Sequence, residues 1–168
     1  MRRSIGVLLL AVSLALAIAT PASALKPFRF KPGPNPDIVL EGVCDFSVLG
    51  QDVVNKLVIT DFFDRDGNLV RETGHGRIVV RVTNQETDKS IVKNISGPGT
   101  FTFDESGATL VATGNWLFGF GPGEVAGTME GLLWFTSGRF VWRFNFADET
   151  WTLLSHTGTI QDICPLLE

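Results

Sequence analysis

The stretch RFVWRFNF, from Arg139 to Phe146, decides the fold class. Large apolar side chains occupy every second position of it, and arginine or asparagine occupies most of the positions between them. Successive side chains of a β-strand point to opposite faces of its sheet, so this spacing predicts a strand with one buried face and one solvated face. Such one-sided strands are typical of antiparallel sheets.

The same pattern recurs along the chain. In GRIVVRVTN, residues 76–84, Ile78, Val80 and Val82 alternate with Arg77, Arg81 and Thr83. Further runs rich in Val, Ile, Thr, Phe and Trp are separated by short turn segments that contain Gly, Asn or Asp. We therefore predict an all-β protein. Short connections favour an antiparallel up-and-down β-barrel of about eight strands, because closure removes exposed strand edges. A β-sandwich is the alternative.

The first 24 residues have the features of an export signal. Arg2 and Arg3 precede an unbroken apolar run, and PASA then offers the small residues that a signal peptidase reads. We expect cleavage after Ala24 and a secreted protein. A membrane anchor is the competing interpretation, but the run is short of the ~20 apolar residues that a span requires. The general secretory route is favoured over twin-arginine export.

Removal of this segment makes the chain more acidic. The sequence has 14 Lys and Arg and 18 Asp and Glu, and two of its arginines lie before the cleavage point. The remaining 12 cationic and 18 anionic side chains give a net charge of −6. Phosphate contacts need clustered Lys and Arg, so nucleic acid is not an expected partner. No membrane anchor is expected after cleavage, and the composition does not predict an oligomeric state.

Two cysteines remain, Cys44 and Cys164. Outside the cytoplasm such a pair favours a disulfide over two free thiols, and the chain has only two histidines to complete a zinc site. A disulfide here would bring the first and last strands side by side. We predict no metal site and no cofactor.

Residues 25–37 read LKPFRFKPGPNPD, in which four prolines forbid a regular helix. We predict a Pro-rich arm that is either a mobile leader, which is favoured, or a segment whose Phe28 and Phe30 dock on the domain or on a partner. A single domain is expected to follow over residues 38–168.

The segment GNWLFGFGPGE, residues 114–124, combines aromatic side chains with glycines. It has neither the spacing nor the lysine of a phosphate-binding loop. We expect a strand up to about Phe120 and then a turn at Gly121–Gly123, with Trp116 in the core and Phe120 at a flexible rim. The aromatic residues expected to line a pocket or its rim are Trp116, Phe118, Phe120, Trp134 and Trp142.

Polar candidates are few. Asp61 has apolar neighbours on its own strand face, and Asp61, Glu72 and Asn94 form the candidate polar pocket, with His75 as a possible addition. Ser155 and His156 adjoin on a predicted strand and point to opposite faces, so they cannot hydrogen-bond as nucleophile and base without a distortion, and a hydrolase triad is not expected. The arginines of alternating strands are expected on a solvated outer face; arginines lining a pocket for an anion are the alternative.

Three segments carry a resemblance to other proteins: Val92–Phe118, Thr136–Asn145 and TGTIQDIC at 157–164. They resemble a group of small exported proteins of high-GC Gram-positive bacteria, and the likeness covers most of the chain after residue 24. It implies export but no activity and no catalytic residues. The strand pattern is also similar, in architecture only, to eight-stranded barrels such as lipocalins and allene oxide cyclase.

Three functions follow as hypotheses. Thirteen Phe, four Trp and no Tyr give an almost wholly apolar aromatic content, which favours a non-enzymatic barrel that binds a small apolar ligand or a protein partner. An isomerase-like or cyclase-like enzyme would need polar side chains to converge on the cavity. A structural or interaction module would have a filled core.

Overall fold

A computed structural model describes residues 25–168; the predicted signal segment lies outside the described residues. Within this range the chain forms eleven strands and one short helix, and no helix in it is both long and apolar enough to cross a membrane. The elements are β1 (Phe28–Phe30), β2 (Ile38–Leu40), β3 (Val48–Asn55), β4 (Val58–Phe63), β5 (Leu69–His75), β6 (Ile78–Asn84), β7 (Ser90–Asn94), β8 (Gly99–Asp104), β9 (Gly107–Phe120), β10 (Leu132–Asn145), β11 (Thr150–Asp162) and α1 (Cys164–Leu167).

The strands form two antiparallel sheets, so the predicted all-β antiparallel class is confirmed. Sheet A has the order β1-β4-β5-β8-β9-β10-β11, and sheet B has the order β2-β3-β6-β7. This hydrogen-bonded order does not close either sheet into a barrel. The Pro-rich arm is docked in sheet A, where Phe28–Phe30 pairs with Ile59–Asp61, and it then leads into β2 of sheet B.

Three strands pass from one sheet to the other. β3 continues into β4, β5 into β6, and β7 into β8, each through a break of two to four residues. The two bent strands β3–β4 and β5–β6 stay hydrogen-bonded to each other where they break, because the backbone N–H of Lys56 donates to the carbonyl of Arg77 at 2.8 Å. Counting each of the three pairs as one bent strand turns the eleven segments into eight strands.

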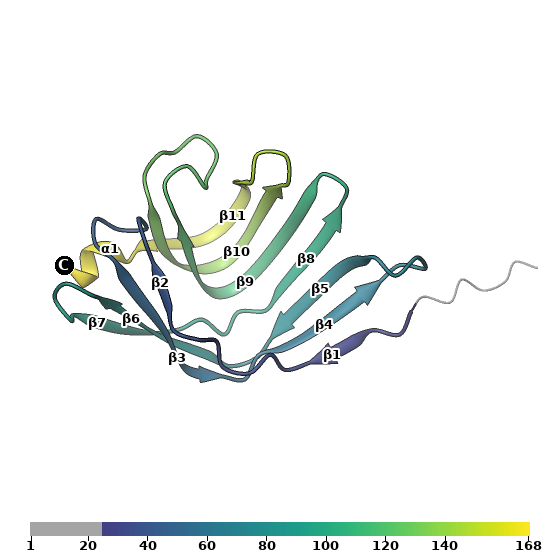
Figure 1. Cartoon of the computed structure of the whole chain (residues 1–168), viewed down its shortest axis with the longest axis horizontal. Coiled ribbons are helices and arrows are strands. Elements are labelled where there is room, and N and C mark those ends of the chain that lie inside the picture. The colour runs from purple at the N-terminus through teal and green to yellow at the C-terminus, as the bar shows by residue number, and fades with distance from the viewer. Residues whose placement is uncertain (1–24) are drawn as a thin grey trace, which may run out of the picture.

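A row of glycines bends the long hairpin strands. Gly114, Gly138 and Gly158 are direct neighbours across β9, β10 and β11, and all three have positive φ angles, of 80°, 133° and 119°. A Cβ on Gly138 would lie 2.8 Å from the Cα of Gly158, so the two backbones approach closely. We call this row the glycine crease. The three strands bend at this row and curve toward the same side on both sides of it (Figure 1). We call the curved unit formed by β9, β10 and β11 the roll.

The roll is tied shut by a backbone contact at its rim. The loop after β9 reaches the free edge of β11, where Trp151 N–H donates to the carbonyl of Glu124 at 2.7 Å. The N–H of Ala126 donates in turn to the carbonyl of Trp151 at 2.8 Å. This two-bond bridge joins the loop after β9 to the start of β11.

Two apolar cores lie on opposite faces of the roll. The first fills the space between sheet B and the outer face of β9 and β10, and its buried residues are Val43, Val48, Val82, Leu133, Ile163 and Leu167. The second fills the inside of the roll, and its buried residues are Leu110, Ala112, Phe118, Phe120, Phe140 and Trp142. In the second core the rings of Phe118 and Phe120 lie 5.5 Å and 5.0 Å from the ring of Trp142.

The predicted disulfide between Cys44 and Cys164 is confirmed. The two Cα atoms lie 5.6 Å apart and are separated by 120 positions in the sequence. The bond fixes α1 against the segment before β3, and the adjoining Ile163 and Leu167 are fully buried in the first core.

Candidate functional site

Two carboxylates face the same side of sheet A. Asp61 on β4 is the direct cross-strand partner of Glu72 on β5, so both side chains point to one face. The neighbouring positions on that face are apolar: Ile59 lies two residues before Asp61, and Phe101 on β8 is the partner of Glu72. We call this side of sheet A, which continues into the inside of the roll, the concave face.

The concave face contains an apolar cavity beside Glu72. Its volume is about 270 Å³. The lining residues come from β4, β5, β6, β8, β9 and the breaks between them: Leu57, Ile59, Glu72, Gly74, Ile78, Ile95, Gly97, Gly99, Phe101, Trp116 and Leu117. Glu72 is the only charged residue among them.

A second cavity adjoins this one. The second cavity has a volume of about 250 Å³ and shares Phe101, Trp116 and Leu117 with the first. The indole lies directly on the backbone of β8, because a Cβ on Gly99 would come within 2.5 Å of its ring. Its Nε1 donates to the carbonyl of Thr113 at 3.3 Å. Glycine at position 99 therefore makes room for the Trp116 ring.

The carboxylate pair has no compensating positive charge. Within residues 25–168 the one ion pair joins Arg143 and Asp104, far along the sheet from Asp61 and Glu72. Oδ1 of Asp61 is buried and has no hydrogen-bond partner. Burial, and then the negative charge of Asp61, raise the pKa of the Glu72 carboxyl. Glu72 therefore holds its proton more readily than a solvated glutamate would.

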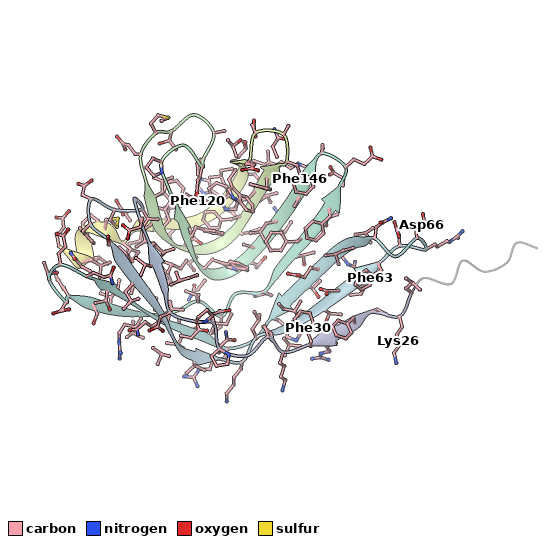
Figure 2. The ribbon with its side chains drawn as sticks, in the orientation of Figure 1. Lys26, Phe30, Phe63, Asp66, Phe120 and Phe146 are labelled. Atoms are coloured by element: carbon pink, nitrogen blue, oxygen red, sulfur yellow. A yellow bond between two sulfur atoms is a disulfide. The ribbon has the colours of Figure 1, made fainter. Side chains whose placement is uncertain are left out.

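The aromatic candidates occupy different depths. Trp142 is fully buried at the centre of the second core, and Trp134 lies half-buried beside it, with the two rings 6.3 Å apart. Phe118 and Phe120 are buried and line the second cavity. The expected rim position of Phe120 is wrong, because curling at the glycine crease folds this strand end inward onto Trp142; Phe120 lies inside the roll in Figure 2. Trp116 is half-buried and packs against the second core.

Asn94 and His75 do not join the carboxylate pair. Both are exposed at the ends of their strands. Asn94 instead shapes the break between β7 and β8, where its Oδ1 accepts from the backbone N–H of Ser96 at 3.1 Å. The polar part of the site therefore consists of Asp61 and Glu72.

Arg143 lies on the face opposite Trp142. It donates to both carboxylate oxygens of Asp104 at 2.7 Å, and its hydrogen bonds hold the pKa of that carboxyl well below its usual range. Arg81 is exposed on sheet B. Neither arginine lines the two cavities, so the expected solvated outer face is what the structure has.

Sequence reasoning missed two parts of the site. Gly97 and Gly99 make room for the indole of Trp116, and their only signal in the sequence is the Gly-Pro-Gly segment at residues 97–99. The glycine crease was also missed, although each of its glycines interrupts a run that otherwise predicts a strand.

Comparisons with protein-family models, with curated proteins and with solved structures find no match. Among the described residues there is no group of three or more His, Cys, Asp or Glu side chains that could hold a metal ion. The site must therefore be interpreted from its own geometry.

Replacing Glu72 should stabilise the protein near neutral pH. The raised pKa means that the folded state binds the proton more tightly than the unfolded state, so stability falls as the pH rises above the ordinary glutamate pKa. Glu72→Gln removes this cost and should raise the free energy of unfolding by about 0.5–1 kcal/mol near pH 7, since a partly solvated charge costs little.

Urea unfolding near pH 7 and near pH 3.5 measures the effect, because glutamate is protonated in both states at the lower pH and the difference should vanish there. Asp61→Asn is the matched control, since it removes the neighbouring charge and should shrink the effect of Glu72→Gln. Equal stabilities of the Glu72→Gln variant and the parent at both pH values would contradict this interpretation of the pair.

Proposed function

We propose that the chain is a secreted, non-enzymatic protein that binds a small apolar ligand on the concave face of sheet A. The observation that carries the proposal is the pair of adjoining cavities, about 270 and 250 Å³ in volume, that are both lined by Phe101, Trp116 and Leu117. Ligand sites are typically concave and mostly apolar, with a few placed polar groups. Here the polar group is Glu72, with Asp61 beside it.

The cavities also bear on the alternative of a filled structural core. A module that only packs would gain from closing such spaces, because apolar voids lose dispersion contacts. Two side-by-side cavities lined by Phe101, Trp116 and Leu117 support a binding role instead.

The proposed ligand site depends on a barrel-like architecture. Three bent strands that pass between the sheets and the backbone bridge at Trp151 both support a barrel opened along one side. The packing of sheet B on the outside of the roll supports the sandwich alternative. We favour the barrel-like form over the sandwich, because a ligand bound inside the roll needs strands that surround the second core.

Trp116→Ala should weaken binding of a neutral apolar probe about tenfold. The indole contacts both cavities, and removal of one buried aromatic anchor costs about 1.4 kcal/mol or more. Titration with N-phenylnaphthylamine, followed by its fluorescence, measures the dissociation constant. Phe146→Ala is the matched control, because Phe146 is exposed at the turn after β10 and lines neither cavity (Figure 2).

Native mass spectrometry of protein recovered from its own culture medium provides the second arm. A co-purified small molecule would identify the ligand directly. If no ligand co-purifies and the probe binds the parent and the Trp116→Ala variant equally, the proposal is overturned.

A second function is favoured by one observation, the raised pKa of Glu72 beside Asp61. A carboxylate that exchanges its proton closer to neutrality suits general acid–base catalysis, as in an isomerase or cyclase acting on an apolar substrate. In that case the Glu72→Gln variant should retain probe binding but lose conversion of the co-purified ligand. Unchanged conversion by the variant would exclude Glu72 as the catalytic group.

A further inference from the structure

The strands of the N-terminal half carry their arginines and their carboxylates on different faces of the sheets. Along the bent strand made by β5 and β6, the odd-numbered positions Arg71, Arg77 and Arg81 are exposed on the side away from the cavities. On β1, Arg29 pairs with Thr60 and shares that side, because its neighbours Phe28 and Phe30 pair with the concave-face positions Asp61 and Ile59. We call this side the outer face.

The strand-borne acids of the same half point the other way. Asp61 and Glu72 lie on the concave face, and Asp52 on β3 lines a third cavity beneath sheet B. Asp52 also accepts from the backbone N–H of Asn35 at 2.8 Å. The outer face of β1 and β3 to β6 therefore carries arginines but no carboxylate from these strands. Asp37, which precedes β2, reaches this face and accepts from Nε2 of Gln51, the cross-strand partner of Arg81, at 2.8 Å.

Apolar side chains lie among these arginines. Val92 on β7 is the cross-strand neighbour of Arg81 and is 53% exposed, and Val39 on β2 is 49% exposed on the same side. The Arg71 guanidinium stacks over the Phe62 ring at 3.9 Å, so its charge is held above the sheet surface. Cations and exposed valines together make this face unlike an ordinary solvated sheet face.

The charged residues are also distributed unevenly along the sequence. The chain after residue 24 has a net charge of −6, yet residues 94–168 contain only two cations, Arg139 and Arg143. The cations are therefore concentrated in the half that carries the outer face, where the ten cations of residues 25–93 balance ten acids. Nitrogen-tipped side chains project from the lower side of the molecule, beneath β3 and β1, in Figure 2. This lower side is continuous from β6 through β3 to β4 and β1 (Figure 1).

The geometry points to a second binding surface: the outer face docks on an anionic lipid bilayer. Basic residues gain free energy near anionic headgroups, and apolar side chains between them enter the interface between headgroups and acyl chains. The surface is a broad sheet face rather than a groove, which matches a bilayer. A soluble polyanion would use the arginines but would leave Val39 and Val92 without a partner.

Vesicle co-sedimentation tests this inference with the secreted protein. Its N-terminus is first checked by mass spectrometry, because the apolar residues before Leu25 would bind lipid by themselves. The protein should sediment with vesicles that contain phosphatidylglycerol, remain in solution with pure phosphatidylcholine, and be released by high salt, which screens surface charges.

The decisive variant combines Arg29→Gln, Arg77→Gln and Arg81→Gln. Each lost cation should weaken vesicle binding about fivefold, and all three about 100-fold. The matched control combines Arg65→Gln, Lys89→Gln and Arg139→Gln, which lowers the net charge equally at exposed sites outside the outer face. Thermal unfolding of both variants shows that each is folded.

Loss of vesicle binding in the outer-face variant, with retention in the control, supports the inference. Equal loss in both variants would show that net charge alone is responsible and would overturn it. Binding of the parent to phosphatidylcholine alone, or to soluble polyphosphate but not to vesicles, would also overturn it. Probe binding to the concave face is measured separately, so the two proposals can fail independently.

Discussion

Gly138→Ala is expected to lower the free energy of unfolding by about 3–5 kcal/mol, because it combines an unfavourable backbone conformation with a backbone clash. Position 138 has a φ of 133°, a region that residues with a side chain rarely adopt. The added Cβ would also lie 2.8 Å from the Cα of Gly158, and that backbone atom cannot move without disturbing the pairing of β10 with β11.

The control for this variant is Gly127→Ala. Gly127 also has a positive φ, of 84°, but a Cβ there would meet no atom within 4 Å. This variant should therefore lose only the conformational part, about 1 kcal/mol. Urea unfolding followed by tryptophan fluorescence measures both. Equal losses in the two variants would show that close approach of the strands at the glycine crease is not required.

Removal of the disulfide should have an effect of similar size. In the chain-entropy model a crosslink over a loop of roughly a hundred residues or more stabilises the folded state by about 4–5 kcal/mol. The Cys44–Cys164 bond spans 120 positions. The double variant Cys44→Ser, Cys164→Ser should therefore lose about 4 kcal/mol, which is much of the total stability of a typical domain.

Denaturant unfolding measures the loss, and the parent protein unfolded with and without a reductant is its control. Reduction of the parent should reproduce the loss of the double variant, because both remove the same crosslink. The variant should also show a larger dependence of the unfolding free energy on denaturant, since its unfolded state is less compact. An unchanged urea midpoint after reduction would contradict the expectation.

The strand content was predictable because it depends on local alternation. Phe140 and Trp142 are buried while Arg139 is exposed, as the spacing in RFVWRFNF indicates. The disulfide was predictable because two cysteines allow one pairing. Neither inference required knowledge of which strands are neighbours.

The parts that were missed depend on register between distant strands. Gly114, Gly138 and Gly158 look like unrelated interruptions until β9, β10 and β11 are aligned, and only then do they form one bend. Asp61 and Glu72 were both named as candidate pocket residues, but their direct pairing follows from the β4–β5 register. Phe120 was misplaced for the same reason, since burial at the end of β9 follows from the curl.

The glycine crease has a further consequence for aggregation. β11 is an edge strand of thirteen residues that contains no Lys, Arg or Pro, the residues that commonly keep edge strands from pairing with other molecules. The shape of β11 instead disfavours pairing with another molecule. Gly158 bends the strand, and a register shift near Leu154 adds a bulge. A straight strand from another molecule cannot follow such an edge. We therefore expect the bend at Gly158 to disfavour aggregation through edge-to-edge pairing of β11 with other molecules.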